Sequence, residues 1–594
     1  MDDSKLIKGG EFLVRETDPA EVFIPEEMDE EQKMIGQTCR DFLDTEVFPM
    51  LDRIDAQEEG LMPGLLKKAG ELGLLAISVP EELEGFGQSF VTAMHASEVM
   101  GAGYSFAVAW SCHTGIGTLP ILYYGNPEQL QKYIPRLASG EWLGAYCLTE
   151  PGAGSDANSG STRAVLSEDG KHYILNGQKM WITNAGFADV FTVFAKIEND
   201  RVLSAFIVER TFPGITFNPE EKKMGIKGSS TRQIFFNDVL VPVENLLGKR
   251  GEGFRIALNI LHMGRIKLGG NVIGSAKKAI DHSVRYANER KQFNCLISQF
   301  GAIKHKLAEQ VIRTFANESA VYRASKHLDD AINLYVANGE DKGRDTMEAF
   351  NHFALEAAVL KVFGSEALDF VVDEAVQIHG GMGFSSEMPV DRGYRDSRIN
   401  RIFEGTNEIN RLLVVDNALK KGAKGILPTR EIAEKAFEEV RNLKNGKTDK
   451  LEYYPEKDLY IANFKKIILM VLISAADKFT RTLVLEQEIL SNLSDSIMQL
   501  YAAESTLLRV KKLESLKGED EIKVYRDILD VFVYDAAAKI SKSLRDASYS
   551  FAFGETRDLL EKGIARFTAV AGVNVKEARR RIADRLIDEN RYCF

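Results

Sequence analysis

The spacing of apolar residues changes twice along this chain, and these two changes constrain the fold more than any other feature. From about residue 29 to residue 143 the apolar residues recur at helical spacing. Between about 145 and 247 they form short, strand-like runs, and from residue 253 onward long helical spacing returns. We therefore expect an α+β protein, mostly α, in which a β domain lies between helical domains.

The strand-like stretch contains several separate strand signals. Residues 190–197, 205–208 and 233–236 are rich in β-branched, aromatic and small apolar residues. The run at 173–182 holds an Asn-Gly dipeptide at 176–177, which is typical of a two-residue hairpin turn. We therefore expect a hairpin at that dipeptide.

Domain limits follow from these changes and from one linker-like segment. Residues 421–429 combine glycine, proline and positive charge, which favour the end of a helix. We predict an N-terminal helical domain at 1–144, a middle β domain at 145–250, a helical domain at 251–425 and an additional helical domain at 430–594.

Composition argues against several classes of function. The formal net charge of −12 disfavours nucleic acid as a partner, and the nine histidines form no HExxH pattern, so we expect no metal site. The five cysteines are odd in number and form no CxxC pair, which argues against a disulfide scaffold. The N-terminus lacks an apolar signal core, and the run Ile467–Ala476 is shorter than the roughly 20 residues that span a membrane. We expect a cytoplasmic protein with reduced thiols.

Residues 401–410 place one carboxylate between an aromatic residue and a glycine. Phe403 can exclude water from Glu404 and raise its pKa, which suits a base that takes a proton from carbon. Gly405 lets the backbone approach a ligand closely. Thr406 is suited to cap a following helix, whose free N–H groups favour an anion. Seen alone, such a glutamate is more often an exposed loop or cap residue.

The sequence signals of function are not limited to residues 401–410, because six other sequence motifs lie along the chain. Through them residues 30–425 resemble the acyl-CoA dehydrogenase family of flavoproteins, and Glu404 stands where the family has its catalytic base. The additional domain resembles that of the very-long-chain group, whose members carry a helical extension. The other motifs are residues 146–156, 176–184, 223–231, 264–265, 289–293 and 377–383.

The resemblance implies a four-helix bundle at 251–425, the cofactor FAD and a set of binding residues. Residues expected to bind FAD within one subunit are Tyr146, Leu148, Thr149, Ser155, Trp181, Thr183, Thr406 and Glu408. Residues expected to bind the adenosine and pyrophosphate of FAD across a dimer interface are Arg290, Gln292, Phe293, Gln377 and Gly381. Residues expected to contact the acyl-CoA substrate are Ser155, Arg265 and Gly405.

The implied activity is FAD-dependent acyl-CoA dehydrogenation in β-oxidation. Glu404 is expected to remove the α proton while the β hydride passes to flavin N5, giving a trans-2-enoyl-CoA. A minority of the family has its base just before the motif arginine, but that residue here is Gly264. Uncharged residues of modest size in the 107–116 segment permit a deep acyl slot, which Trp110 could block or face away from, and we expect long straight-chain substrates.

The resemblance also implies partners and leaves alternatives. The expected electron acceptor is an electron-transferring flavoprotein, and the expected assembly is a homo-oligomer of at least two subunits. The alternatives are an acyl-CoA oxidase, in which oxygen reoxidises the flavin, and an assembly or scaffold protein that uses its extension as a docking surface. Residues 576–588 mix basic and acidic side chains, so we expect a solvated face or dimer contact rather than a membrane surface.

Overall fold

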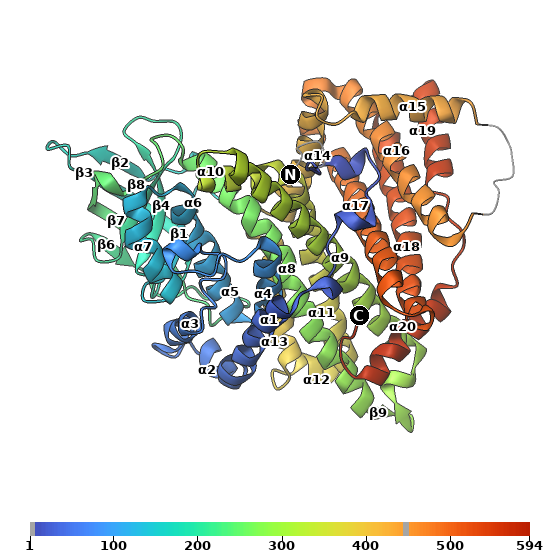
Figure 1. Cartoon of the computed structure of the whole chain (residues 1–594), viewed down its shortest axis with the longest axis horizontal. Coiled ribbons are helices and arrows are strands. Elements are labelled where there is room, and N and C mark those ends of the chain that lie inside the picture. Colours follow the sequence, from blue (N-terminus) through green and yellow to red (C-terminus); the bar gives the residue numbers. More distant parts are fainter. Residues whose placement is uncertain (1–5, 444–450) are drawn as a thin grey trace.

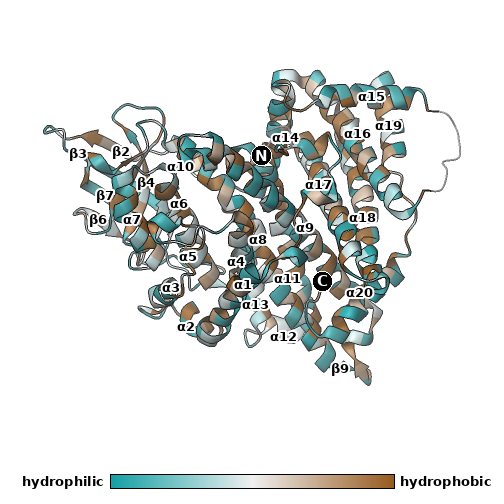
Figure 2. Cartoon of the chain, viewed as in Figure 1, coloured by the Kyte–Doolittle hydropathy of each residue, from teal (hydrophilic) through white to brown (hydrophobic). Residues whose placement is uncertain are grey.

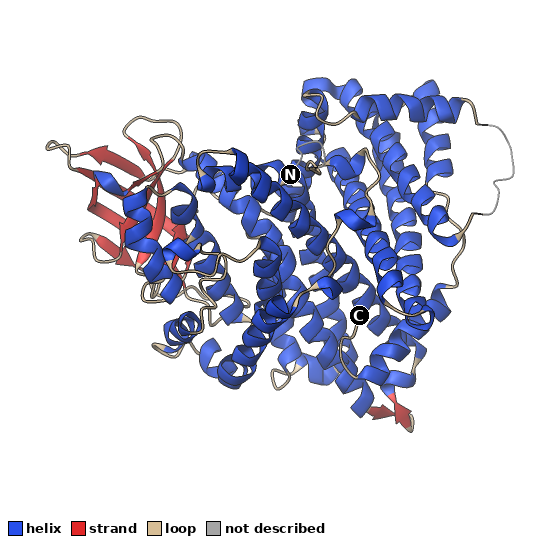
Figure 3. Cartoon of the chain, viewed as in Figure 1, coloured by secondary structure: helices blue, strands red, loops and turns tan. Residues whose placement is uncertain are grey.

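The computed structural model describes residues 6–443 and 451–594. It has a β-rich region at one end, long helices in the middle and a second group of helices at the other end (Figures 1 and 3). This order confirms the α+β fold with a β domain between helical domains. The N-terminal helices are α1 Glu30–Phe42, α2 Leu51–Asp55, α3 Leu61–Glu71, α4 Phe90–Gly101, α5 Ser105–Cys112, α6 Leu119–Tyr124 and α7 Pro127–Ser139.

Local signals set the start of α1. The Asp29 side chain accepts a hydrogen bond from the Gln32 N–H, and the Gln32 side chain accepts one from the Asp29 N–H. This reciprocal capping satisfies two donors that the first turn of a helix leaves free. The buried positions Cys39 and Phe42 lie on the side of α1 that faces the core.

The middle domain is a sheet in the order β6-β7-β3-β2-β4-β5-β8, with β1 parallel to β4. The predicted strand at 190–197 is confirmed as β4, and those at 205–208 and 233–236 lie within β5 and β7. The strands are β1 Gly144–Cys147, β2 Arg163–Leu166, β3 His172–Thr183, β4 Val190–Ile197, β5 Ser204–Glu209, β6 Ile215–Phe217, β7 Thr231–Pro242 and β8 Leu246–Leu247.

The hairpin expected at Asn176-Gly177 is wrong, because β3 runs straight through this dipeptide. The pairing of β3 with β7 shifts register between Leu175 and Gly177, so the glycine marks a bulge. A Cβ at Gly177 would lie 2.6 Å from the Thr162 side-chain oxygen, so close approach of the neighbouring chain explains the glycine. The turn between β2 and β3 lies earlier, at residues 167–171.

The next domain is built on helices α8, α9, α11 and α14. Helix α8 packs along α11 and α9, and α11 also packs on α14, as expected of a four-helix bundle. Its elements are α8 Gly253–Glu289, β9 Lys291–Gln292, β10 Cys295–Leu296, α9 Gly301–Asn338, α10 Lys342–His352, α11 Ala354–His379, α12 Gly381–Phe384, α13 Pro389–Ser397 and α14 Asn407–Ala423.

The additional domain packs on the side of this bundle. Its helix α17 contacts α9 and α14, and α20 contacts α9. In α15 the buried residues Ala433, Ala436 and Val440 follow helical spacing, and most of the other positions are polar (Figure 2). The helices are α15 Thr429–Arg441, α16 Tyr453–Phe479, α17 Gln487–Leu516, α18 Glu519–Phe551, α19 Gly554–Phe567 and α20 Val575–Glu589.

The apolar run Ile467–Ala476 lies in α16, in the interior of the additional domain. By length and composition the segment Tyr453–Leu485 could cross a membrane. However, 72% of its most apolar window is buried against other helices, as in the core helix of a globular domain.

Two arginines of α20 form ion pairs with neighbouring helices. Arg579 pairs with Glu309 at 2.8 Å and with Asp535 at 2.9 Å. Arg581 pairs with Asp527 at 2.6 Å. These pairs attach α20 to α9 and α18.

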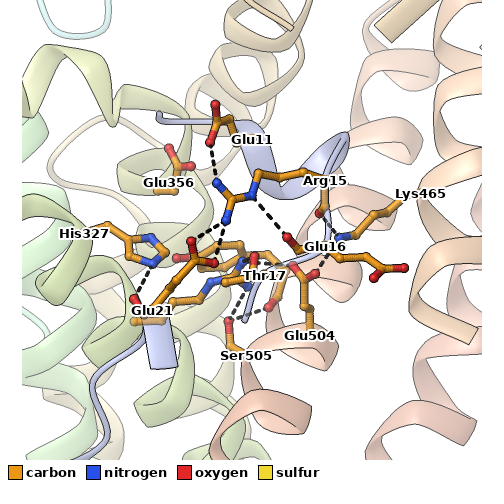
Figure 4. A network of polar contacts seen from close by, with 12 residues as sticks. Glu11, Arg15, Glu16, Thr17, Glu21, His327, Glu356, Lys465, Glu504 and Ser505 are labelled. Carbon is orange, nitrogen blue, oxygen red and sulfur yellow. Dashed lines mark hydrogen bonds and ion pairs between the residues drawn. The ribbon is translucent and has the colours of Figure 1, made fainter. Parts of the chain in front are cut away.

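Residues 6–28, here called the N-terminal strap, leave the N-terminal helices and run between α9 and α17 (Figures 1 and 4). The Gly10 N–H donates to a Glu356 carboxylate oxygen of α11 at 2.6 Å. Lys465 of α16 donates to the Arg15 carbonyl at 2.5 Å. The strap therefore joins the additional domain to the bundle, although the sequence placed it with the N-terminal helices.

Buried charges lie under the N-terminal strap. Glu504 of α17 accepts from Lys465 at 2.5 Å and from Arg323 of α9 at 2.9 Å (Figure 4). Arg323 also donates to the Thr17 hydroxyl at 2.8 Å. All three ionised side chains are at least nine-tenths buried, so each depends on the others for charge compensation.

Candidate functional site

A cavity lies between the N-terminal helices and the bundle, and Glu404 stands on its wall. Its volume of about 160 Å³ compares with roughly 10–15 Å³ for one water in the same measure. Helices α5, α8, α11 and α13 and residues 399–404 line it, mostly with apolar side chains. The cavity can therefore hold a ligand with a substantial apolar part.

The conformation, burial and pKa of Glu404 suit a general base. Its φ is +60°, a left-handed conformation that is uncommon outside glycine. Its Oε2 atom is buried and has no hydrogen-bond partner. Burial raises the pKa of its carboxyl to about 7, although the charges of Arg265 and Lys361 oppose the rise. The prediction of a raised pKa agrees with this environment.

Three side chains hold the backbone around Glu404. Arg265 of α8 is buried and donates to the Glu404 carbonyl at 3.0 Å. Asn410 donates to the carbonyls of Gly405 at 2.8 Å and Thr406 at 3.0 Å. The Thr406 hydroxyl accepts from the Ile409 N–H at 3.3 Å, so the predicted cap of α14 is confirmed.

Gly264 leaves the space that the Glu404 carboxylate occupies. A Cβ at position 264 would lie 2.8 Å from Oε2, closer than real Cβ atoms come to other atoms. The position that carries the base in a minority of the resembled family thus faces the glutamate directly. A larger side chain there would displace the Glu404 carboxylate.

Arg265 is not a solvated helix residue. It hydrogen-bonds to the base segment and approaches His262, whose Nδ1 lies 3.2 Å from a guanidinium nitrogen. Burial lowers the pKa of Arg265, while the charge of Glu404 raises it. These contacts make Arg265 a positioning residue, and its contact with substrate stays a prediction.

Sequence reasoning missed Lys361. This residue of α11 is buried, and its Nζ donates to Asn407 Oδ1 at 2.6 Å, beside the start of α14. Burial lowers the pKa of its ammonium group to about 7, against the opposing charge of Glu404. The sequence did hold a signal for Lys361, which is the one lysine in the mostly apolar helical run 354–363. A lysine on a buried helix needs a polar partner.

The residues expected to bind a flavin within one subunit lie at or after the ends of β1 and β3 and at the start of α14. Tyr146 and Leu148 are buried at the end of β1, and Thr183 lines the cavity at the end of β3. Trp181 is 61% exposed, with φ at +56°. A large aromatic residue held open in a left-handed conformation fits a surface that a planar ligand covers.

The loop after β1 is exposed to solvent, and a buried ion pair holds its start. No atom lies within 4 Å of a Cβ built on Gly152 or Gly154. Ser155, the next residue, is exposed. Below it, Glu150 pairs with Lys179 at 2.7 Å, with both side chains buried. Burial tends to raise the pKa of Glu150, but Lys179 lowers it to about 2, so this anchor stays ionised. The loop and Trp181 therefore fit FAD.

The remaining predicted residues lie at the opposite end of the bundle. Arg290, Gln292 and Phe293 form the exposed tip after α8, and Gln377 and Gly381 are exposed nearby at the end of α11. Residues 264 and 289 are separated by about 38 Å along α8 at 1.5 Å per residue. One subunit therefore cannot bring Glu404, which Gly264 faces, and Arg290 to the same ligand group.

Trp110 does not block the cavity. It is buried in the core of the N-terminal helices, and its indole N–H donates to the Leu74 carbonyl at 3.1 Å. Its smaller neighbours Val108, Ser111 and Cys112 line the cavity instead. No cluster of three or more potential metal ligands occurs within residues 6–443 and 451–594.

Comparison with known proteins gives consistent matches along the chain. Family models match the "Acyl-CoA dehydrogenase" N-terminal domain at residues 29–141, middle domain at 145–239 and C-terminal domain at 251–419. A further model, also described as an acyl-CoA dehydrogenase C-terminal domain, matches residues 463–566 within the additional domain.

Individual relatives share most of the length. A probable acyl-CoA dehydrogenase of Bacillus subtilis is 42% identical over 98% of both chains. The very long-chain specific acyl-CoA dehydrogenase of Rattus norvegicus is 36% identical over 86% of this chain and 79% of its own. The crystal structure of a Bacillus anthracis acyl-CoA dehydrogenase complexed with FAD superimposes with a TM-score of 0.95 at 44% identity, covering 99% of this chain and 100% of that one.

Proposed function

Because the chain belongs to the acyl-CoA dehydrogenase family, an FAD-dependent group of oxidoreductases, we propose that it oxidises long straight-chain fatty acyl-CoA to trans-2-enoyl-CoA in β-oxidation. The observation that carries this proposal is the Glu404 carboxylate. Its Oε2 is buried on the cavity wall without a partner, and its pKa is about 7. A base of this strength can accept a proton from carbon, and about half of it is ionised at pH 7.

Glu404 takes the proton from the substrate α carbon, and the Cα–Cβ bond becomes double. When bound, FAD supplies the acceptor for the hydrogen that leaves the β carbon with its electron pair. Arg265 and Asn410 fix the Glu404 backbone, so the carboxylate does not reorganise as the proton moves. The burial of the cavity excludes water, which would compete for the base.

The FAD ring would lie against Trp181, Thr183 and the segment after β1. The phosphates would meet Ser155 and the free N–H groups at the start of α14, beside Thr406 and Glu408. Gly405 has a φ of +80°, which brings the backbone of the base segment close to the substrate thioester.

The length of the cavity supports long acyl chains. Its lining residues on α8 run from Gly264, which faces Glu404, to His282. Those 18 residue steps correspond to about 27 Å at 1.5 Å per residue. An extended hydrocarbon chain with C–C bonds of about 1.5 Å advances roughly 1.3 Å per carbon, so about 20 carbons fit this length.

The test is to mix the purified flavoprotein anaerobically with acyl-CoAs from short to very long chain. We expect rapid loss of flavin absorbance with long chains and slow recovery when oxygen is admitted, with an electron-transferring flavoprotein restoring the absorbance quickly. Fast recovery in oxygen would instead assign an acyl-CoA oxidase. If no acyl-CoA reduced the flavin absorbance, the scaffold hypothesis would become the favoured one.

We propose further that two subunits share each FAD. Arg290 and Gln292 follow the end of α8, about 38 Å along the helix from Gly264, which faces Glu404. A two-fold dimer would place one subunit's tip at the other's site. Phe293 is 89% exposed, which is typical of a large apolar residue that meets a partner.

Mixing two inactive variants tests this arrangement. The Arg290→Ala/Gln292→Ala variant is expected to lose FAD, and Glu404→Gln keeps FAD but lacks its base. A heterodimer of the two holds one complete site, so equal mixing after unfolding and refolding restores about a quarter of wild-type turnover. If Arg290, Gln292 and Glu404 of the same subunit served one site, mixing the two variants would restore no turnover. Arg285→Ala, which changes an exposed arginine four residues before α8 ends, is the control for FAD retention.

A further inference from the structure

Two lysines line the cavity: Lys278 lies over the Phe48 ring at 4.1 Å, whereas Lys267 has no partner among the described residues. Lys267 lies on the lining side of α8, one turn after Gly264, the residue that faces Glu404. No hydrogen bond or ion pair joins it to any residue within 6–443 or 451–594. Burial alone lowers the pKa of its ammonium group to about 8, with no neighbouring charge opposing this shift.

Three other buried lysines of this protein have a carboxylate or amide partner. Lys179 pairs with Glu150 at 2.7 Å, Lys465 pairs with Glu504 at 2.5 Å, and Lys361 donates to Asn407 at 2.6 Å. An ammonium group withdrawn from water without such a partner is strongly disfavoured. A hydrocarbon chain passing Lys267 would offer no acceptor and would remove the remaining water.

The walls near Lys267 differ in polarity. Leu268 and Val272 present apolar side chains to the cavity, as a fatty acyl chain requires. One helical turn beyond Lys267, Asn271 presents an amide whose Oδ1 is buried without a partner, while its Nδ2 donates to Ser111 at 2.9 Å. Part of the cavity is thus built for more than methylene groups.

Resting on the proposed dehydrogenation, we propose that Lys267 is a specificity residue that binds a carboxylate carried by the acyl chain of the substrate. The enzyme accordingly oxidises acyl-CoAs whose chain ends in a carboxylate in preference to methyl-ended chains of the same length. The carboxylates that line the cavity, Glu404 and Asp396, do not pair with Lys267, so a substrate carboxylate would provide its anionic acceptor. A charge-assisted hydrogen bond in a water-poor site is strong.

The position of Lys267 sets the chain length at which this preference is largest. Its Cα lies about 4.5 Å beyond that of Gly264 along the helix, and an extended lysine side chain reaches about 6 Å further. The carboxylate therefore binds roughly 5–10 Å beyond the α carbon. This distance corresponds to chains of about six to ten carbons at roughly 1.3 Å per carbon.

The experiment compares carboxylate-ended, hydroxyl-ended and methyl-ended acyl-CoAs of these lengths with the FAD-loaded wild type, Lys267→Met and Lys267→Arg. The measured quantity is kcat/KM from anaerobic flavin reduction. We expect wild type to favour the carboxylate-ended chain and Lys267→Met to lower that preference by about tenfold to a hundredfold. Lys267→Arg, which keeps the charge, is expected to retain most of it.

A thermal unfolding curve separates this role from a structural one. Because Lys267→Met removes a half-buried charge that has no partner among the described residues and keeps similar volume, the variant is expected to melt no lower than wild type. A marked drop in melting temperature would show that the lysine supports the fold, and would overturn the proposal.

The remaining outcomes are also decisive. Equal preference in wild type and Lys267→Met, with plain chains oxidised normally, would overturn the role of Lys267 while leaving the proposed dehydrogenation intact. A preference for the hydroxyl-ended chain would overturn the assignment of an anionic group. No flavin reduction by any acyl-CoA would refute the proposed function itself.

Discussion

Glu404→Gln is expected to keep FAD and bind acyl-CoA, yet to reduce its flavin about three to four orders of magnitude more slowly than wild type. The amide has nearly the same shape but cannot accept the α proton. Stopped-flow flavin absorbance measures the rate, and the flavin spectrum with bound ligand confirms that both ligands are present.

A matched control separates this effect from a general change of α14. Asp416 is an exposed carboxylate on the same helix, paired with Lys420 at 2.7 Å. Asp416→Asn is expected to reduce flavin at nearly the wild-type rate. Substantial residual reduction by Glu404→Gln would remove Glu404 from its role as the base.

The same residue sets the expected pH dependence. Glu404 must be ionised to act, and burial raises the pKa of its carboxyl from the ordinary 4.5 to about 7. Flavin reduction at limiting substrate is therefore expected to rise with pH through about 7 rather than through 4.5. A raised carboxyl pKa also means that ionisation costs folding stability as the pH passes from 4.5 to 7. Glu404→Gln without ligand is accordingly expected to unfold no more easily than wild type at pH 8.

Glu504→Gln is expected to destabilise the protein by about 3–5 kcal/mol, the usual result of removing one partner from a buried charge network. Glu504 compensates both Lys465 and Arg323 under the N-terminal strap (Figure 4). The glutamine would leave two buried cations without an anion. Urea unfolding, followed by both circular dichroism and flavin release, measures the loss.

The exposed pair Arg430–Asp477 provides the control. Its atoms are also close, at 2.6 Å, but both side chains are more than half exposed. Asp477→Asn is therefore expected to change stability by less than about 1 kcal/mol. Equal effects of the two substitutions would show that burial does not decide the strength of the Glu504 network.

The Glu504 effect is also expected to depend on pH. Burial tends to raise the pKa of Glu504, but Lys465 and Arg323 together lower it below the ordinary 4.5. A lowered carboxyl pKa contributes stability above pH 4.5 that is lost as the pH falls toward the folded-state value. The difference between wild type and Glu504→Gln is thus expected to be full at pH 7 and to narrow in acid.

Part of this protein is determined by interactions between residues close in sequence. The bounds of β4 and the capping of α14 by Thr406 agree with the sequence prediction, and the capping of α1 by Asp29 is equally local. Each depends on side-chain spacing or on a hydrogen bond across three residues, so neighbouring residues suffice. The Glu404 segment belongs here as well, because the aromatic residue and the glycine adjoin the carboxylate.

Tertiary structure decided the features that depend on distant residues. Gly177 forms a bulge instead of a hairpin because Thr162 approaches it, and the N-terminal strap crosses to α11 and α16 through its backbone. The pairing of Lys361 with Asn407 joins residues 46 positions apart. Sequence spacing carries no record of such contacts, since packing selects them among many locally equivalent choices. The sequence therefore determined most elements and the candidate base, and the tertiary structure determined the charged surroundings of Glu404 and the isolation of Lys267.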